Sequence, residues 1–329
     1  MRKFKWIIGI ILISGGIFFI GSLFQEKKVT NMSMKEIIEK NYMNKEGYIH
    51  AHPNQIDSQY LSESIGLYME YLVQANDAEA FQQEVKKLEK EFLIETDKHT
   101  FIQWAIFETA HVNALIDDVR IIAALQHASE KFEQPTYDKL AAELKQGLTG
   151  KMQLDGYYPD FYDWSYDTTS ARVVLSYLSP EFFHVLTNTK QSLELLKELS
   201  HLEQVFFPEI YDLEIGDFQL VEHVHMIDQL LIASNREHIE ESSPAFQEWL
   251  IQEWDTKGKL FGQYHRTTLE PVVNYESLSV YYYLHAYFEL VGENEQADKV
   301  IERAKQIEHS TELKNVHFFD FILGQQLTH

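Results

Sequence analysis

The spacing of apolar residues predicts a chain built almost entirely from α-helices. From residue 34 onward, apolar side chains recur every three or four positions, which places them on one face of a helix. Strand-like patterns are scarce and are confined to residues 47–50 and 262–265. The expected helices have ordinary globular lengths and cover residues 34–43, 60–74, 79–93, 101–111, 117–132, 137–148, 170–186, 192–206, 218–232, 244–254, 274–290, 295–307 and 318–323.

The first 33 residues have a different pattern, that of a membrane anchor and its linker. Residues 1–5 form a basic leader, residues 6–24 are apolar and carry no charge, and residues 25–33 are polar. The apolar run is close to the ~20 residues that span a bilayer and exceeds the ~7–15 residues of a signal-peptide core. We therefore expect an uncleaved single-pass anchor with a cytoplasmic leader, and a cleaved signal peptide is the alternative. In both cases the remaining chain lies outside the cytoplasm.

Residues 34–329 are expected to form one all-α domain, since no stretch rich in proline, glycine or serine divides them. No fixed-period repeat is evident, which argues against a helical repeat array. We predict instead a toroid in which pairs of helices stack around a common centre, and we expect it to be a monomer. In a toroid the loops at one end converge, so that distant parts of the sequence can build one site.

The composition supports a large core and limits the chemistry. Of the 329 residues, 45% are hydrophobic and 13% are aromatic, which is enough for a sizeable core. The net charge of −23 argues against nucleic acid or anionic lipid as a partner of the main domain. The sequence holds no cysteine, which excludes disulfides, thiolate catalysis, cysteine-based zinc sites and attachment of a lipid to cysteine.

Three acidic positions lie where predicted helices begin. Glu63 follows Ser62, Asp118 follows Asp117, and Glu222 lies near the start of a helix expected over residues 220–232. Each acid can simply cap its helix or favour the positive end of the helix dipole, which is the alternative interpretation. Because helices stacked in a ring can bring their starts together, these acids can also face one another across a groove.

The turn around Glu63 has two further features. Ser58, Ser62 and Ser64 can each cap the helix, which would place Glu63 in or just before its first turn. Gly66 has no Cβ, so that either another helix or a ligand can approach this turn closely.

The histidines His223 and His225 invite a metal hypothesis. On a helix, however, residues two positions apart do not face each other, and the tight spacings of zinc sites are missing. We therefore expect neither a metal nor another cofactor.

Carboxylates on opposite sides of a sugar linkage are the groups that glycoside hydrolysis needs, with one holding a proton and the other ionised. Aromatic rings that can bind the faces of sugars are frequent in this chain, although core packing is the alternative for each of them. The candidates are Tyr48, Tyr60, Tyr68, Trp104, Tyr157, Tyr158, Tyr162, Trp164, Tyr177 and Tyr281.

Residues 62–69 resemble the best motif of glycoside hydrolase family 8, Ser-Glu-Gly-x-Gly-Tyr-Gly-Met. The chain reads Ser-Glu-Ser-Ile-Gly-Leu-Tyr-Met there, so that Ser62, Glu63, Gly66 and Met69 match, whereas the first glycine and the Tyr-Gly pair are replaced. The resemblance is closest to the short, membrane-anchored members found in exopolysaccharide loci of Gram-positive bacteria.

Residues 114–121 occupy the place of the second family motif, Ala-Ser/Thr-Asp-Ala/Gly-Asp. Asp118 falls on the carboxylate that binds the central sugar in the family, and Ile116 replaces the earlier aspartate. Residues 175–183 resemble the Pro-Ser-Tyr-Phe-x-Pro segment of the family.

The third family motif is Tyr-Asp-x-x-Arg-x-Pro, whose aspartate is the general base in many members. Residues 221–227 are similar in position, with Glu222 in the place of the aspartate and His225 in the place of the arginine. Asp228 and Asp167 are the alternatives for the base.

The resemblance covers residues 34–329 and implies an (α/α)6 barrel that cleaves a β-linked polysaccharide with inversion. It implies that Glu63 is the general acid, that Glu222 is the general base, and that Asp118 holds the central sugar. We expect the substrate to be bound by Tyr48, Tyr68, Trp104, Tyr177 and His225.

Two other functions are compatible with the sequence. The departures at Ile116, Glu222 and His225 would also suit a glycan-binding protein that keeps the hydrolase fold without turnover. A helical scaffold in a membrane polysaccharide-synthesis complex would instead have no carboxylate-lined groove and would expose a large apolar patch.

Overall fold

A computed structural model describes residues 32–53, 58–96, 98–106, 111–201 and 204–329. The chain divides into two compact units, Met1–Ile37 and Ile38–His329. In the first unit, Ser33 and Glu36 form a capping box, since Glu36 Oε2 accepts from Ser33 N at 2.7 Å and Ser33 Oγ accepts from Glu36 N at 3.3 Å. The expected leader and anchor, residues 1–24, lie outside the described residues. Within the described ranges, every helix is too short or too polar to cross a bilayer.

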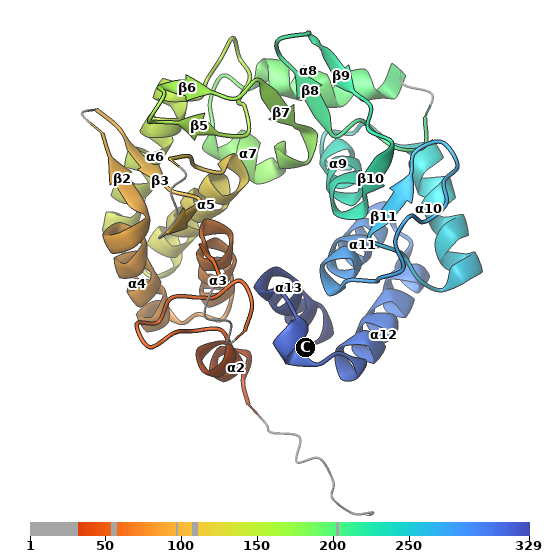
Figure 1. Ribbon diagram of the computed structural model, residues 1–329, viewed down its shortest axis with the longest axis horizontal. Coiled ribbons are helices and arrows are strands. Elements are labelled where there is room, and N and C mark those ends of the chain that lie inside the picture. Colours follow the sequence, from red (N-terminus) through yellow and green to blue (C-terminus); the bar gives the residue numbers. More distant parts are fainter. Residues whose placement is uncertain (1–31, 54–57, 97, 107–110, 202–203) are drawn as a thin grey trace, which may run out of the picture. The chain divides into compact units, whose positions relative to one another are not determined.

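The second unit is built around an inner ring of helices that lie side by side (Figure 1). Along the ring, α3 packs on α5, α5 on α7, α9 on α11 and α11 on α13, and α13 closes the ring on α3. The short 3-10 helix η2 (Leu175–Tyr177) makes the link to α9. The inner helices are α3 (Ser62–Gln74), α5 (Leu115–Lys131), α7 (Pro180–Val185), α9 (Met226–His238), α11 (Leu278–Val291) and α13 (Phe318–Thr328).

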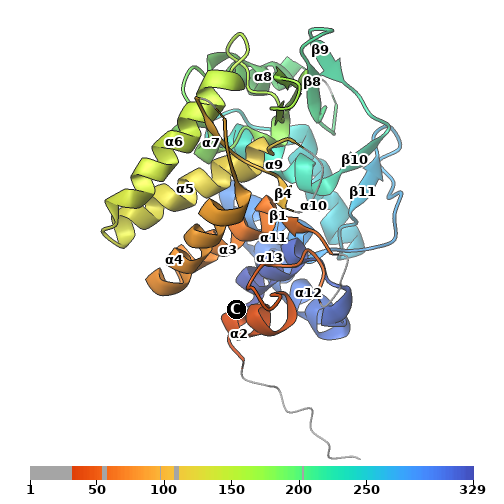
Figure 2. The same cartoon turned by 60° about the vertical axis from the view of Figure 1, so that its left-hand side comes forward.

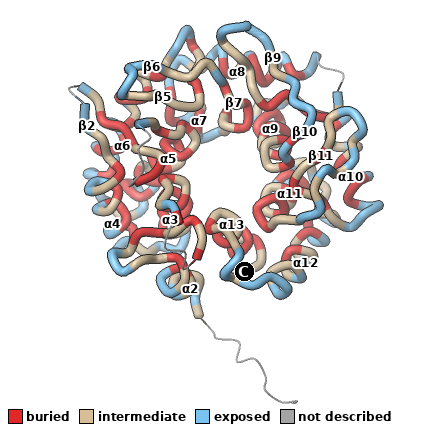
Figure 3. Tube along the Cα trace, viewed as in Figure 1, coloured by how far each residue is buried: buried red, intermediate tan, exposed pale blue. Residues whose placement is uncertain are grey.

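A second set of helices covers the outside of this ring. Among them, α4 packs on α3, α6 on α5, α8 on α9 and α12 on α11. Figure 3 shows that the exposed positions lie mostly at the outer edge. The outer helices are α4 (Ala78–Lys87), α6 (Pro135–Lys151), α8 (Lys190–Glu198), α10 (Pro244–Lys257) and α12 (Asn294–Ser310), and α2 (Met34–Asn41) begins in the first unit. Short helical turns are η1 (Leu88–Phe92), η3 (Leu199–His201) and η4 (Leu313–Asn315).

Short strands connect the helices and form small antiparallel sheets. The pairs are β1 with β4, β2 with β3, β5 with β6, and β10 with β11, and a three-stranded sheet has the order β7-β8-β9. Figure 2 shows β8 to β11 on one side of the ring, away from the ends of α4 to α6. The strands are β1 (Tyr60–Leu61), β2 (Leu93–Glu95), β3 (Thr100–Ile102), β4 (Ala105–Ile106), β5 (Tyr162–Asp163), β6 (Thr168–Thr169), β7 (Arg172–Val174), β8 (Ile210–Asp212), β9 (Asp217–Gln219), β10 (His223–His225) and β11 (Gln263–His265).

The prediction of a helix over residues 101–111 is wrong for the part of that segment that the structure describes. It begins with the hairpin strand β3 and continues into β4. Strand β3 lies directly against α6, where a Cβ on Gly147 would come within 2.4 Å of the Thr100 carbonyl oxygen. Tertiary packing of buried residues therefore decides the conformation here, and an apolar run of this length does not by itself distinguish helix from strand.

Two other predicted helices begin much later than expected. In the segment 170–186, strand β7 pairs with β8, and the helix α7 begins only at Pro180, which occupies its first turn. In the segment 218–232, strands β9 and β10 come first, and α9 begins at Met226. The expectation that Glu222 lies at a helix start is therefore wrong, because His223–His225 pair with β11 instead.

The close approach expected at Gly66 is that of another helix. A Cβ on Gly66 would lie 3.1 Å from Ile121 Cγ1 and 3.3 Å from Arg120 Cδ, so that α5 packs directly on the first half of α3. The missing side chain lets these two inner helices, and the acids at their starts, lie close together.

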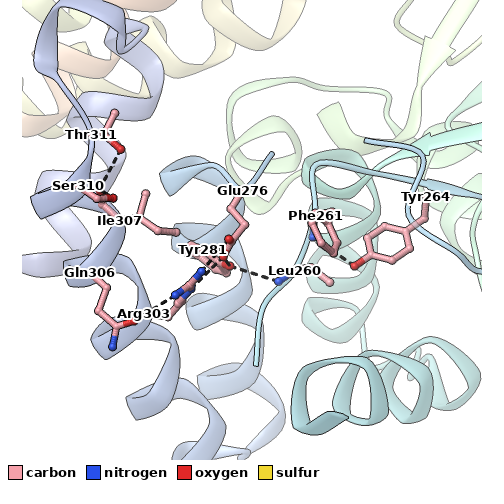
Figure 4. A network of polar contacts seen from close by, with 10 residues as sticks. All are labelled: Leu260, Phe261, Tyr264, Glu276, Tyr281, Arg303, Gln306, Ile307, Ser310 and Thr311. Carbon is pink, nitrogen blue, oxygen red and sulfur yellow. Dashed lines mark hydrogen bonds and ion pairs between the residues drawn. The ribbon is translucent and has the colours of Figure 1, made fainter. Parts of the chain in front are cut away.

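An ion-pair network joins an inner helix to an outer one on the other side of the ring (Figure 4). Arg303 on α12 donates to both carboxylate oxygens of Glu276 at 2.7 Å and 2.9 Å. Tyr281 on α11 donates its hydroxyl proton to Glu276 and accepts a hydrogen bond from Leu260 N at 3.2 Å. The network thus fixes the loop ahead of α11 against both helices.

Candidate active site

Acidic side chains occupy the first turn of every inner helix except α11, and in α7 this residue is the exposed Glu181. Glu63 is the second residue of α3, whereas Asp117, Asp228 and Asp320 are each the third residue of α5, α9 and α13. A carboxylate is favourable there because the helix dipole is positive at this end. Because these helices are members of one ring, their first turns can contribute to a common site.

Glu63 lies among other charged groups at this end of the ring. Burial raises the pKa of Glu63 to about 7, with a further contribution from the negative charge of Asp117. The positive charge of Arg120 opposes this rise, and Asp320 adds to it. A carboxyl group with this pKa is about half protonated at neutral pH, so it can act as a proton donor.

Asp117 connects the starts of α3 and α5. Its Oδ2 accepts from Ser62 Oγ at 2.8 Å, and its Oδ1 accepts from Arg120 Nη1 at 2.9 Å. Burial raises the pKa of Asp117, and Arg120 and Ser62 oppose that rise. Ser62 is therefore not the expected cap of α3, since the N-cap is Leu61 and the Ser62 hydroxyl binds the carboxylate of the next inner helix.

Asp228 is the acid that lies beyond η2 along the ring. Its Oδ1 accepts from Ser176 Oγ at 2.6 Å. Burial raises the pKa of Asp228, opposed by Ser176 and by His225. A second carboxylate lies near it, because Asp228 also raises the pKa of the buried Glu209, whose Oε1 accepts from His225 N at 2.8 Å.

Tyr177 links the two groups of acids. Burial raises the pKa of its phenol, and the negative charges of Asp117 and Asp228 raise it further. Because both carboxylates act on this one half-buried side chain, Asp117 and Asp228 lie on the same side of the ring. Glu63, Asp117, Tyr177 and Asp228 are therefore linked as electrostatic neighbours, and we call this set of side chains the carboxylate groove.

Asp118 lies behind this groove and not in it. It is only 1% exposed, and its Oδ2 accepts a hydrogen bond from Asn113, whose amide also contacts Met152 Sδ at 3.0 Å. Asn113 Oδ1 in turn accepts from Tyr162 N. Asp118 therefore ties the start of α5 to the chain segments behind it, and the neighbouring Asp117 is the acid that acts on Glu63.

The two other sequence candidates for a general base are exposed. The Glu222 side chain is 74% exposed and lies 3.2 Å from His265 Nε2 on the neighbouring strand. Asp167 lies in the turn between β5 and β6, is 70% exposed, and binds Lys151 at 2.6 Å. Of the candidates, only Asp228 lies in the carboxylate groove.

The expected substrate-binding residues fall into two groups. Tyr48 and Tyr68 pack into the core, where Tyr48 donates to Glu91 at 3.1 Å and Tyr68 stacks on Tyr71 at 6.0 Å between ring centroids. Trp104, Tyr177 and His225 lie close to the acids. The Trp104 carbonyl accepts from Ser62 N at 2.8 Å, and exposed His225 directly precedes α9.

Sequence reasoning did not assign Asp117, Arg120 or Asp320 to the site. One signal was available, because α5, α9 and α13 begin with two apolar residues followed by aspartate: Leu115-Ile116-Asp117, Met226-Ile227-Asp228 and Phe318-Phe319-Asp320. The connections between these helices differ in length, so that the recurrence has no fixed period and is easily missed. Nothing in the sequence pattern marks Arg120, whose role depends on its neighbours in space.

The described part of the chain contains no group of three or more histidine, cysteine, aspartate or glutamate side chains placed to hold a metal ion. The exposed His223 and the half-buried His265 face each other across β10 and β11, with ring centroids 6.0 Å apart.

The chain is similar in sequence to two proteins. It is 32% identical over 284 residues to the Bacillus subtilis (strain 168) protein called "Putative lipoprotein YdaJ", covering 82% of this chain and 77% of that protein. It is also 32% identical to PssZ from Listeria monocytogenes, whose crystal structure superposes with a TM-score of 0.81 over 90% of this chain and 94% of that chain. No family model matches the chain.

More distant structures share the fold. One is described as a novel alpha-amylase from Clostridium perfringens, with a TM-score of 0.77 and 19% identity over 89% of this chain and 95% of that one. Another is endoglucanase Cel10, a family 8 glycosyl hydrolase from Klebsiella pneumoniae, with a TM-score of 0.59 and 14% identity over 87% and 94%. The expected resemblance to glycoside hydrolase family 8 is thus confirmed for the fold.

Proposed function

Because the chain belongs to the family that includes YdaJ and PssZ and has the fold of the family 8 glycosyl hydrolases, we propose that it is a glycoside hydrolase. The observation that carries the proposal is the series of electrostatic neighbours that leads from Glu63 to Asp117, and from Asp117 through Tyr177 to Asp228. A helical scaffold would not need half-buried or buried acids at the first turns of several inner helices. We further assign the ring to the (α/α)6 barrels.

Glu63 is the general acid in this proposal. Its raised pKa leaves a proton on the carboxyl group near neutral pH, and this proton passes to the glycosidic oxygen as the bond from that oxygen to the sugar C1 breaks. The positive charge that develops on the sugar ring is stabilised by the neighbouring carboxylates. The reaction uses only carboxyl groups and a water molecule.

Asp228 replaces Glu222 as the general base. Its carboxylate takes a proton from the attacking water, whose oxygen forms the new bond to C1 on the face opposite the departing oxygen, so that the configuration inverts. Ser176 donates to Asp228 at 2.6 Å and orients the carboxylate, whereas Glu222 is exposed and lies against His265.

Asp117 replaces Asp118 as the acid that holds the sugar hydroxyls. Its carboxylate is oriented by Ser62 and Arg120 beside Glu63, whereas the Asp118 carboxylate is buried on Asn113. Tyr177 and Trp104 would contact the sugar rings, and His225 would contact the end of the substrate near Asp228.

We propose that the substrate is a β-linked polysaccharide outside the cytoplasm, and that the protein acts as a monomer. The endo-beta-1,4-glucanase CMCax from Acetobacter xylinum, which has a similar fold, supports a β-linked substrate by its name, whereas the alpha-amylase of similar fold makes an α-linked glucan the competitor to test. Residues 6–24 would anchor the enzyme in the membrane, since the 329 residues hold no cysteine for lipid attachment.

The experiment that tests the acid is Glu63→Gln, assayed for the release of reducing sugar from β-glucans, amino-sugar polymers and starch. The amide has nearly the same shape and cannot donate the proton, so hydrolysis should fall at least ~100-fold while polysaccharide binding is kept. Full activity of Glu63→Gln would refute the assignment. Binding without turnover by the unmodified protein would favour the glycan-binding alternative.

The test for the base compares Asp228→Asn with Glu222→Gln. Removal of a general base costs roughly 10²–10⁴-fold in rate, so Asp228→Asn should lose hydrolysis to that extent, whereas the exposed Glu222→Gln should keep it. The reverse result would return the base to Glu222. Thermal unfolding of both variants checks that neither loss reflects misfolding.

Membrane attachment is tested by fractionating cells that express the full chain or a chain that starts at residue 32. The full chain should sediment with membranes and resist extraction by salt, and the shortened chain should not. Recovery of the full chain in the soluble fraction with a new N-terminus after residue 24 would instead indicate a cleaved signal peptide.

A further inference from the structure

A cavity of about 380 Å³ lies inside the inner ring and meets the carboxylate groove at Tyr177, which belongs to both. It is lined by residues of α3, α5, α9, α11 and α13 together with the segment from η2 to α7. On α5 the lining residues run from Ile116 to His127 in steps of three and four along one face. At ~1.5 Å per residue these positions extend over about 16 Å, so that the cavity follows the axis of the ring.

At α3 and α5 the cavity opens at the end that lies away from the proposed catalytic acids, whereas at α7 the exposed lining residue Glu181 is in the first turn. Its exposed lining residues are Gln74, His127 and Glu181. Gln74 is the last residue of α3, and His127 lies about one turn before the end of α5, whereas Glu63 and Asp117 lie in the first turns of the same helices. Neither Glu63 nor Asp117 lines the cavity.

Arg120 and Tyr177 lie between the cavity and the catalytic acids. Its side chain lines the cavity, while its Nη1 donates to Asp117 at 2.9 Å and its Nε lies 3.7 Å from Glu70 Oε2. Glu70 also lines the cavity, one helical turn below Gly66. The Arg120 guanidinium thus lines the cavity and also binds a carboxylate of the groove.

The walls combine hydrogen-bonding groups with aromatic rings. Arg120 supplies N–H donors, Glu70 supplies acceptors, and Gln74 and Gln326 supply both. The rings of Tyr282 and Tyr283 form another wall. A wall with paired donors and acceptors beside aromatic rings suits the hydroxyls and flat faces of a sugar, and the volume falls in the range of ~300–1,000 Å³ that is usual for ligand sites.

The charges of the cavity disfavour an anionic ligand. Glu70 and Glu181 bring two carboxylates, whereas Arg120 is the one lysine or arginine among the described lining residues and already binds Asp117. A purely apolar ligand would leave these polar groups without partners, which is costly. A neutral ligand rich in hydroxyls avoids both the repulsion by the carboxylates and the loss of partners for the polar groups.

We propose that the axial cavity is a second saccharide-binding site, which takes one or two neutral sugar rings through Arg120, Glu70 and the rings of Tyr282 and Tyr283. The site does not need hydrolysis to bind its ligand, so this inference stands independently of the proposed function. Because Arg120 donates to Asp117, a ligand that contacts Arg120 also changes the surroundings of the Asp117 carboxylate.

The test measures the binding of cellobiose and of N,N′-diacetylchitobiose to the Glu63→Gln protein by calorimetric titration. In that background, Gln74→Trp places a large ring at the mouth of the cavity, and Gln326→Trp does so from α13. Gln83→Trp makes the same change at an exposed position of the outer helix α4 and is the matched control. Each mouth variant should weaken the binding of at least one disaccharide tenfold or more, or remove one of two binding events, and Gln83→Trp should change nothing.

Unaltered binding in both mouth variants, or no binding in the Gln83→Trp control, would overturn the inference. A crystal soaked with the bound disaccharide should place it against Arg120 and Tyr282, and density in the carboxylate groove alone would also overturn it. The hydrolase proposal fails separately, by the absence of turnover in the unmodified protein, so that the two outcomes can be told apart.

Discussion

At the scale of single residues, the protonation of Glu63 depends on the charges of its neighbours. Burial is the largest cause of its raised pKa, Asp117 is the next, and Arg120 acts in the opposite direction. A general acid must be protonated to work, so activity should fall as the pH rises through about 7. Two features can be tested: the pH at which activity falls, and which neighbouring charges set that pH.

Asp117→Asn should move the fall in kcat/KM to lower pH. The neutral amide no longer opposes ionisation of Glu63, and Arg120 still favours it, so the pKa of Glu63 decreases. The measurement is the alkaline midpoint of kcat/KM against pH, which is separate from any change in its height. Asp138→Asn, at an exposed position of α6, is the control and should keep the midpoint. A midpoint that stays in place or rises in Asp117→Asn would contradict the assigned coupling.

The sequence indicated Glu63 as a candidate because its motif is local, with Ser62, Gly66 and Met69 all within one turn or two. The local sequence could not tell whether Asp117 or Asp118 is the acid that faces Glu63. Adjacent residues of a helix point about 100° apart, so a shift of one residue changes which acid faces the groove. That angle depends on where α5 begins, which is at Leu115 and two residues earlier than the apolar pattern indicated.

At the scale of elements, the Arg303–Glu276 pair joins α12 to the loop ahead of α11. Glu276→Gln should lower the free energy of unfolding by about 1.5–3 kcal/mol, because charge-assisted hydrogen bonds are lost around a largely buried carboxylate. Glu295→Gln removes an exposed pair with Lys299 and should cost no more than about 0.5 kcal/mol. Urea unfolding of the three proteins measures both changes, and equal losses would contradict the burial argument.

The difference between the unmodified protein and Glu276→Gln should also depend on pH. Burial alone would raise the pKa of Glu276, but hydrogen bonds from Arg303 and Tyr281 outweigh it, and the pKa is lowered below 4.5. A lowered pKa in the folded state means that this stabilisation is present above about 4.5 and is lost as the pH falls through the folded value. The advantage over Glu276→Gln should therefore shrink in acid.

The long helices were predictable because their apolar faces repeat over many turns, as in α5, α6 and α12. The errors fall where the chain pairs with a distant segment, as β10 does with β11 and β7 with β8. A three-residue strand carries too short a pattern to be distinguished from a helix turn, and its partner is not visible from local sequence. The exposed position of Glu222 follows from that pairing.

At the scale of the second unit, the ring closes through contacts between its two ends. Tyr42 donates its hydroxyl proton to the Val316 carbonyl at 3.1 Å, and its ring lies 4.9 Å from Phe321. Phe318 N donates to the Ala51 carbonyl at 2.8 Å, and α13 packs on α3. The sequence predicted a toroid, but these closing contacts join residues too far apart for any local pattern to reveal them.

The helix α13 completes both the core and the groove, so its removal should prevent folding. A chain that ends at Val316 loses the buried residues Phe318, Ile322 and Leu323 and also Asp320 near Glu63. We expect it to lack a single cooperative thermal transition, because α3 and α11 each lose the inner neighbour that α13 provides. A chain that lacks only residues 328–329 should unfold like the complete protein. If the chain ending at Val316 also unfolded cooperatively, α13 would be an accessory to the ring and not the element that closes it.

Phe321→Ala is the milder test of the same helix. It should lower the free energy of unfolding by about 3–5 kcal/mol without removing the helix.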